Sequence, residues 1–230
     1  MKNSQLETSL LGLGLYTVAE AAAYTGIPAR EIRRWLFGYT TNGKHHDGLW
    51  RPELEGTAEN ALSFHDLLEI RFVYAFRRHG VSLQAIRRAS ECARELFHQD
   101  YPFTCKRFQT DGRSIFATVH EETLDETLID LVKKQYVFKQ VIAPSLYEGI
   151  EYTQDGEAQR WFPVRRNRRV VLDPQRNFGK PMLADTGVGV DAVLSAWHAE
   201  GKDAKLVADI YEIPVEAVRA AIQFEHRDVA

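Results

Sequence analysis

The stretch EAAAYTGIPAREIRRWL (residues 20–36) decides how the N-terminal part of this chain folds. Apolar residues recur with the 3.6-residue period of an α-helix on both sides of Gly26, and Pro28 suits the first turn of a second helix. This is a helix-turn-helix pattern. The second helix carries three arginines at i, i+3 and i+4, away from its apolar side: Arg30, Arg33 and Arg34. Such a face can contact nucleic-acid phosphates, and a solvated charged helix is the alternative.

Charge is distributed unevenly along the chain. Its 230 residues, 44% of them hydrophobic, suffice for one large domain or for two or three small ones. The net charge of −3 divides into +1 for residues 1–99, −5 for 100–159, +6 for 160–180 and −5 for 181–230. Because association follows the local potential, segment 160–180 and the arginine-bearing helix are the candidate contacts with anions.

The cysteines and the apolar runs indicate the cellular compartment in which we expect the protein. Cys92 and Cys105 fit no metal-ligand spacing and are too few for a disulfide framework, so we expect a reducing cytoplasm. No run approaches the roughly 18 apolar residues of a membrane span, and the N-terminal segment has no small-residue cleavage site. We therefore expect no membrane association and no export.

A glycine-bearing insert, TTNGKHHDGLWRPELEGTAENA (40–61), follows the second helix. Its composition predicts a small hairpin or wing, which carries Lys44, His45, His46 and Arg51. The run His45-His46-Asp47 could ligate zinc, but solvated or phosphate-facing side chains are the interpretation that we favour. Two more helices follow, with Ser63 and Ser82 as their N-caps and Gly80 closing the first.

In this order of elements, residues 16–97 resemble the winged helix-turn-helix DNA-binding domain of MerR-type regulators. YTVAEAAAYTGIPAREIRRWL, the glycine-bearing insert and LSFHDLLEIRFVYAFRRHGVSLQAIRRA carry the resemblance. In that family the second helix enters the major groove and the wing grips the neighbouring backbone. The resemblance implies the following DNA-binding residues: Thr17, Arg30, Arg33, Arg34, Tyr39, Lys44, His45 and Arg51. We expect Trp35 in the core rather than stacked on a base.

Residues 100–164 predict an α+β middle module. Asp111-Gly112 and Asp155-Gly156 each lie between β-prone runs, which predicts two hairpins. Between them TLDETLIDLVKKQYVFKQVI (123–142) has the pattern of a long amphipathic helix. Trp161 and Phe162 could stack on RNA or fill the core of a hairpin. We find no glycine-rich phosphate loop and no catalytic grouping, so we expect no catalytic residues and no cofactor.

Residues 165–230 predict a basic linker and a helical domain. RVVLDP (169–174) predicts a strand ending at a proline turn, GKPMLADTGV (179–188) an irregular loop, and three helices begin near Val190, Asp203 and Pro214. The last two helices repeat the opening pattern around Ile-Pro, but the second carries only Arg219 among several acids. Because a phosphate backbone needs positive charge, we interpret this copy as protein-binding.

Residues 168–225 resemble the small domain of unknown function found in prokaryotic antitoxins encoded beside PIN-like ribonuclease toxins. FGKPMLADTGVGVDAV and VRAAIQFE carry this resemblance. A MerR-like head joined to such a tail resembles the long VapB-type antitoxins. The resemblance implies a PIN-like toxin as partner, and such toxins bind divalent metal with clustered carboxylates.

The basic run has three interpretations: contact with DNA backbone, a solvated linker, or insertion into an acidic partner. Guanidinium groups match carboxylate pairs in bidentate geometry and stay charged at any cellular pH, so we favour the acidic partner. The candidate toxin-binding residues are Arg165, Arg166, Arg168 and Arg169.

The sequence thus predicts an α+β protein of three parts: a winged helix-turn-helix (1–99), a middle module of two hairpins around a long helix (100–164), and a basic linker with a three-helix, helix-turn-helix-like domain (165–230). We expect a cytoplasmic antitoxin that binds operator double-stranded DNA through residues 16–62 and a PIN-like ribonuclease through its C-terminal part, as a homodimer or a higher assembly with toxin. A MerR-like transcriptional regulator whose middle module binds a small ligand is the alternative, and an enzyme comes third.

Overall fold

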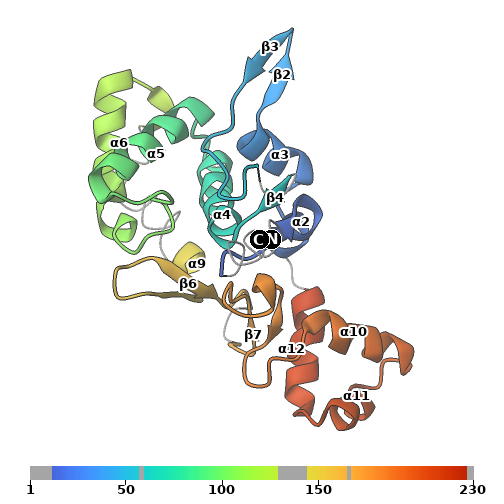
Figure 1. Cartoon of the computed structure of the whole chain (residues 1–230). Helices are drawn as coiled ribbons and strands as arrows, with labels where there is room; N and C mark the ends of the chain where they lie inside the picture. The colour runs from blue at the N-terminus through green and yellow to red at the C-terminus, as the bar shows by residue number, and fades with distance from the viewer. Residues whose placement is uncertain (1–11, 57–59, 129–143, 165–166, 227–230) are drawn as a thin grey trace, which may run out of the picture. The chain divides into compact units, whose positions relative to one another are not determined.

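The structure, a computed structural model, describes residues 12–56, 60–128, 144–164 and 167–226. The chain forms two compact units, whose parts are shown in Figure 1. The larger unit comprises Tyr16–Glu148 and Tyr152–Ala158, and the smaller unit comprises Met1–Leu15, Gly149–Glu151 and Gln159–Ala230, apart from the ranges left out. Residues of the expected middle module, 100–164, occur in both units.

The helix-turn-helix begins the larger unit. Strand β1 (Tyr16–Thr17) leads into α2 (Val18–Thr25), and α3 (Ala29–Phe37) follows after a turn. The Thr17 hydroxyl accepts a hydrogen bond from the Glu20 amide at 3.2 Å, and the Glu20 carboxylate accepts one from the Thr17 amide at 2.8 Å. This capping box fixes where α2 starts, and Gly26, with φ of 69°, ends it.

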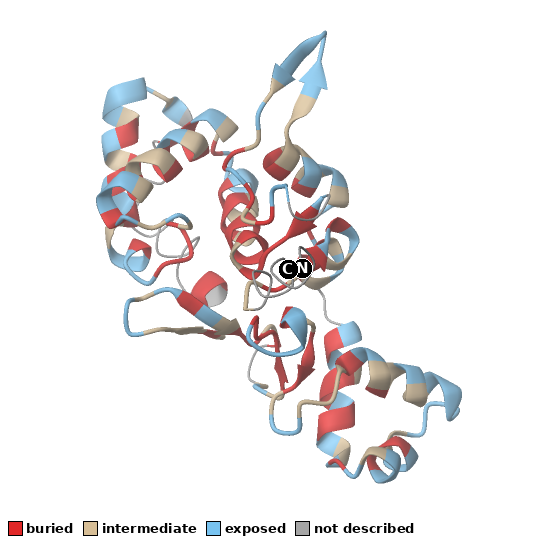
Figure 2. Ribbon diagram, viewed as in Figure 1, coloured by how far each residue is buried: buried red, intermediate tan, exposed pale blue. Residues whose placement is uncertain are grey.

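A hairpin follows α3, as expected for a wing. Strands β2 (Tyr39–Thr41) and β3 (Lys44–His46) pair antiparallel, with Thr41 opposite Lys44. Asn42 and Gly43 both have positive φ, which two-residue hairpin turns of this kind require. Figure 2 shows that this hairpin is mostly exposed, whereas α4 is mostly buried. Strand β4 (Ala61–Leu62) then pairs with β1.

Two helices complete the core of the larger unit. Helix α4 (Phe64–Arg78) and helix α5 (Leu83–Phe97) begin at the predicted N-caps Ser63 and Ser82, each of which accepts a hydrogen bond from the amide three residues on. Four buried aromatic rings pack edge-to-face or tilted near α4: Phe76, Phe103, Phe108 and Phe116. Such pairs add stability beyond the area they bury.

The predicted hairpin at Asp111-Gly112 is wrong, because helix α6 (Phe108–Thr123) runs through it. Phe108, Ile115, Phe116 and Val119 recur at helical spacing and are all buried. Gly112 lies against this core, since a Cβ there would come within 2.6 Å of the Phe108 ring. The helical apolar pattern, which continues over the 16 residues of α6, therefore outweighs the local preference of Asp-Gly for a turn.

The long helix predicted over 123–142 lies mostly outside the described residues. Its described beginning does not form one helix, because Leu124 adopts φ of 53° and ends α6. A 3-10 turn, η1 (Glu126–Leu128), follows, and the next described helix is the short α9 (Pro144–Tyr147).

The second predicted hairpin is present. Strand β5 (Ile150–Tyr152) pairs with β6 (Ala158–Trp161), and Gly156 adopts φ of 85° in the connecting turn. Trp161 and Phe162 are buried, and Phe162 packs with Val171 and Met182. Of the two interpretations of these rings, the structure supports core residues.

The smaller unit continues with two short paired strands and three helices. Strand β7 (Val170–Val171) pairs antiparallel with β8 (Met182–Leu183), and the 3-10 turn η2 (Asn177–Gly179) lies between them. The sequence predicts an irregular loop over residues 179–188, and this prediction is wrong because the segment contains β8, whose side chains are buried against β7.

The three predicted helices start as expected, at α10 (Val190–Ala199), α11 (Ala204–Tyr211) and α12 (Val215–Glu225). Asp203 caps α11, and Glu212, in the left-handed conformation, ends it before Ile213-Pro214. Ile27-Pro28 and Ile213-Pro214 thus join two helix pairs in the same way. Among the described residues, no helix combines the length and apolarity that a membrane crossing requires.

Candidate nucleic-acid interface

Helix α3 packs one face against the core and exposes the other face to solvent. Ile32, Trp35 and Leu36 are buried, which confirms Trp35 as a core residue. Arg30 and Arg33 are exposed, and within the described residues neither has an ion-pair partner. Two cations on adjacent turns of α3 are therefore available to an anionic partner.

Arg34 does not share this open position. It is half-buried, and its guanidinium carbon lies 4.0 Å from the centre of the Tyr39 ring. Tyr39 in turn stacks on His46, with ring centres 4.7 Å apart and planes 12° apart. This stack, Arg34–Tyr39–His46, joins α3 to both strands of the hairpin, so two predicted contact residues have a positioning role.

The other predicted contact residues occupy distinct surroundings. Lys44 is exposed on β3 and, in the described part of the chain, forms no ion pair. His45 lies 3.4 Å from the Asp47 carboxylate, and Arg51 pairs with Glu55. Thr17 uses its hydroxyl to cap α2, as described above. The hairpin and the segment after it therefore offer one open cation, Lys44, and two side chains that already lie near acids, His45 and Arg51.

Two glycines allow the backbone to pass close to its neighbours at the two ends of the hairpin. A Cβ at Gly38 would lie 2.3 Å from the carbonyl of His46, and one at Gly48 would lie 2.3 Å from the carbonyl of Leu36. Gly38 also has φ of 76°. Any larger residue would push the hairpin away from the helix.

Arg87 of α5 braces the end of the hairpin and was missed by sequence reasoning. Its Nη2 donates to the carbonyls of Asp47 and Gly48 at 2.9 and 3.0 Å. The Leu49 amide donates to the Trp35 carbonyl at 2.6 Å in the same region. No local sequence signal links residues about 40 positions apart, so only the fold identifies this brace.

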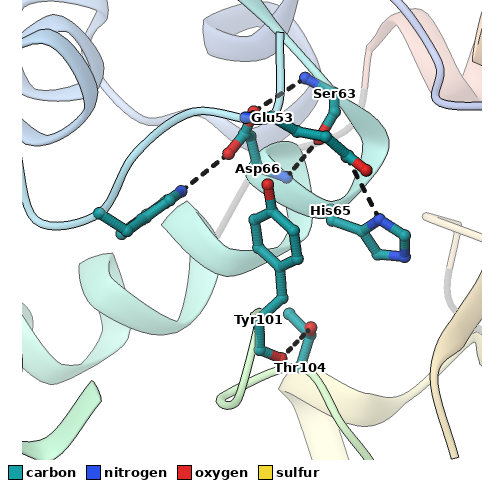
Figure 3. A network of polar contacts seen from close by, with 7 residues as sticks. Glu53, Ser63, His65, Asp66, Tyr101 and Thr104 are labelled. Carbon is teal, nitrogen blue, oxygen red and sulfur yellow. Dashed lines mark hydrogen bonds and ion pairs between the residues drawn. The ribbon is translucent and has the colours of Figure 1, made fainter. Parts of the chain in front are cut away.

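A buried carboxylate fixes the segment after the hairpin (Figure 3). Asp66, at the start of α4, accepts hydrogen bonds from Trp50 Nε1 at 2.8 Å and from the amides of Ser63 and Glu53 at 3.1 and 3.3 Å. Burial raises the pKa of Asp66, and the hydrogen bonds from Trp50 and Ser63 oppose that rise. Asp66 therefore connects the segment 50–53 to α4.

An ion pair lies next to Asp66 in the same network. His65 Nδ1 is 3.5 Å from a Glu53 carboxylate oxygen, and the His65 ring stacks on Tyr101 with centres 5.1 Å apart (Figure 3). Burial works to lower the pKa of His65, but the hydrogen bond and charge of Glu53 outweigh it and the pKa is raised. Burial likewise opposes ionisation of Glu53, and the contacts with His65 and Ser63 lower its pKa overall. Both partners are thus stabilised in their charged forms.

Glu69, one turn further along α4, holds the turn after α5. Its two carboxyl oxygens accept hydrogen bonds from the amides of Phe103 and Thr104, both at 3.1 Å. Complete burial raises the pKa of Glu69 to about 8 against the effect of these donors. A cavity of about 180 Å³ beside this network is lined by Glu53, His65, Tyr101 and Glu157 among others. Within the described residues, no group of three or more His, Cys, Asp or Glu could hold a metal ion.

Two of the predicted toxin-binding residues, Arg168 and Arg169, are described and lie in the smaller unit. Arg165 and Arg166 fall outside the described residues. Arg168 pairs with Glu151 and lies over the Phe162 ring at 4.1 Å, and Arg169 lies 3.6 Å from the exposed Asp185 carboxylate. The structure therefore brings the two described arginines to acids of their own chain.

Comparisons with known proteins match both ends of the chain. Residues 14–90 match a family described as "Putative DNA-binding HTH domain", and residues 170–224 match "Protein of unknown function (DUF433)". The first segment contains the helix-turn-helix, the hairpin and α4, and the second contains β7, β8 and the three C-terminal helices.

Relatives cover nearly the whole chain. The Mycobacterium tuberculosis protein "Putative antitoxin VapB45" is 28% identical over 228 residues, covering 90% of this chain and 92% of its own. "Uncharacterized protein Rv2308" from the same organism is 25% identical, covering 97% of this chain and 95% of its own. The crystal structure of Rv2018 from M. tuberculosis has a TM-score of 0.67 at 24% identity, covering 92% of this chain and 98% of its own, and is similar in fold.

Proposed function

We propose that this protein is a DNA-binding antitoxin of a toxin–antitoxin pair. The larger unit binds operator DNA and thereby regulates its own operon, and the smaller unit binds and neutralises a PIN-like ribonuclease toxin. The similarity to "Putative antitoxin VapB45" over 90% of this chain supports the antitoxin role, and the match of residues 14–90 to "Putative DNA-binding HTH domain" supports the DNA-binding role. Neither role needs a cofactor or a catalytic residue.

The observation that carries the DNA-binding role is an open cationic helix joined to a hairpin. Arg30 and Arg33 extend from α3, which the Arg34–Tyr39–His46 stack fixes to β2 and β3. Cations without an acidic partner can neutralise phosphates and release condensed counterions without first breaking an ion pair. We propose the MerR-like docking mode, with α3 in the major groove.

The remaining predicted residues contact the DNA backbone in this proposal. Lys44 and His45 on the hairpin and Arg51 after it reach phosphates beside the groove that holds α3. On binding, Arg51 leaves its ion pair with Glu55 and pairs with a DNA phosphate. Thr17 lies at the exposed start of α2, where the backbone amides of the helix can contact a second phosphate. A winged helix-turn-helix offers few contacts alone, so the protein acts as a dimer on paired half-sites.

Two measurements on the wild-type chain test the two halves of the proposal. Fluorescence anisotropy compares its affinity for the DNA upstream of its own gene with that for shuffled DNA of equal length. Titration against the purified product of the adjacent reading frame measures inhibition of ribonuclease activity. Equal affinity for both DNAs contradicts operator binding, and undiminished ribonuclease activity contradicts the antitoxin role.

A further inference from the structure

A turn of the smaller unit contains an aromatic residue whose side chain is exposed and whose backbone conformation is strained. Phe178, in η2, is 53% exposed and has φ of 51°. Its neighbours Asn177 and Gly179 also have positive φ, at 47° and 78°. Asparagine and glycine tolerate this conformation, whereas a phenylalanine Cβ approaches the following carbonyl oxygen and is strained.

Backbone hydrogen bonds, rather than packing of the ring, impose this conformation. The Leu15 amide donates to the Phe178 carbonyl, the Gly179 amide to the Arg176 carbonyl and the Lys180 amide to the Asn177 carbonyl, all at 2.9 Å. A strained residue normally persists where the structure around it enforces the strain, and such residues cluster at functional sites. Since burial within its own chain does not offset the strain at Phe178, a partner that covers the ring would do so.

Arg176, two residues before, is open to an outside acid. It is exposed, and its guanidinium lies over the backbone of Gly187, where an added Cβ would come within 2.8 Å of Nη2. Arg160 and Arg168 both pair with Glu151, and Arg169 lies near Asp185. Among the arginines of segment 160–180 that the structure describes, Arg176 is the one without a carboxylate partner.

We infer that Phe178 and Arg176 form a docking turn for a protein surface with an apolar pocket and a carboxylate at its rim. This inference rests on the proposed function, in which that surface belongs to the toxin. Aromatic and arginine side chains are the residues that most often dominate the binding energy of interfaces, and a guanidinium matches a carboxylate in bidentate geometry. The charge of segment 160–180, +6, complements an acidic partner, whereas residues 181–230 carry −5.

The test uses the full chain and the purified product of the adjacent reading frame, with affinity measured by isothermal titration. Phe178→Asn removes the ring and keeps a residue that tolerates positive φ, and Arg176→Gln removes the charge. Each is expected to weaken binding by about ten- to thirtyfold, as loss of an interface anchor does. Because the strain is removed with the ring, the thermal midpoint of Phe178→Asn stays at or above that of the wild type.

Matched controls come from the larger unit, to which the proposed function assigns no contact with the toxin. Leu96→Ala removes an apolar side chain that is 50% exposed, and Arg78→Gln removes an exposed arginine at the end of α4. Both are expected to bind the toxin like the wild type. Equal losses in the controls and the test variants would show a diffuse interface and overturn the inference.

The outcomes separate this inference from the proposed function. If the wild type binds the neighbouring protein and both turn variants bind equally well, the docking turn is wrong and the antitoxin role stands. If the wild type does not bind it at all, both ideas fail. If the variants lose affinity only for a labelled single-stranded RNA, the turn is a nucleic-acid contact and the protein-docking inference is overturned.

Discussion

The guanidinium of Arg34 lies 4.0 Å from the centre of the Tyr39 ring, and this contact connects helix α3 to the hairpin. A cation over an exposed aromatic ring contributes about 0.5–1 kcal/mol. We expect Tyr39→Ala to weaken operator binding about fivefold by releasing the hairpin, and Tyr39→Phe to change it by less than about twofold. Anisotropy titration measures both. A loss in Tyr39→Phe as large as that in Tyr39→Ala would assign the role to the hydroxyl instead.

Removing the open arginines of α3 should reduce both affinity and its salt dependence. Arg30→Ala and Arg33→Ala should each weaken operator binding by about 1–2 kcal/mol, and a variant that loses a phosphate contact should lower the salt slope by about 1. Arg219→Ala on α12 is the control and should leave both quantities unchanged. Unaltered binding by the Arg30→Ala, Arg33→Ala double variant at matched salt would exclude α3 from the interface.

Arg87 should act through the hairpin rather than by direct contact with DNA. Arg87→Ala removes two hydrogen bonds to the Asp47 and Gly48 carbonyls, so the amides of Gly48 and Leu49 should exchange hydrogen faster in the free protein. Operator affinity should fall while the salt slope stays constant, because no phosphate contact is lost. A lower salt slope with unchanged amide exchange would show instead that Arg87 binds a phosphate.

Glu69 should make the larger unit less stable as pH rises. Its pKa is raised by burial from 4.5 to about 8, so the folded state holds the proton more tightly than the unfolded state. The resulting loss of stability begins above the unfolded pKa and is complete above the folded one, with a slope of up to about 1.4 kcal/mol per pH unit. Glu69→Gln stays neutral, so its free energy of unfolding should vary less with pH.

Urea unfolding of the wild type and Glu69→Gln across about pH 5 to about pH 8 checks this expectation. The comparison uses the pH dependence rather than absolute stability, because in glutamine an NH2 group, which cannot accept a hydrogen bond, replaces one of the two carboxyl oxygens that accept from the Phe103 and Thr104 amides. The exposed Glu95 on α5 provides the control Glu95→Gln. Parallel pH curves for wild type and Glu69→Gln would mean that Glu69 is already ionised in the folded protein.

The operator should contain paired half-sites. One winged helix-turn-helix makes too few contacts for tight specific binding, so we expect a dimer on two half-sites whose centres are a whole number of helical turns apart. Insertion of about five base pairs between the half-sites, half a helical turn, should weaken binding strongly, and about ten should restore much of it. A footprint that covers a single half-site, together with a monomeric protein in analytical sedimentation, would contradict this arrangement.

The amino-acid sequence determined the elements whose causes are local. Capping by Thr17, Ser63, Ser82 and Asp203 fixed four helix starts, and each depends on a side chain and amides within three residues. The turns at Gly26 and Gly156 and the two Ile-Pro junctions were predictable for the same reason. The arginine cluster on α3 also follows from helical spacing alone.

Tertiary structure decided everything that depends on partners distant in sequence. The Asp111-Gly112 signal favours a hairpin locally, but packing of Phe108 and Phe116 against the aromatic core makes that segment a helix. Spacing gave Arg30, Arg33 and Arg34 one common face. In the fold, Arg34 packs on the Tyr39 ring and Arg168 pairs with Glu151, so neither guanidinium is open to a partner in the way that Arg30 and Arg33 are. Whether a charge is open or satisfied depends on which acids and rings the fold brings within a few ångströms, and no local pattern encodes that.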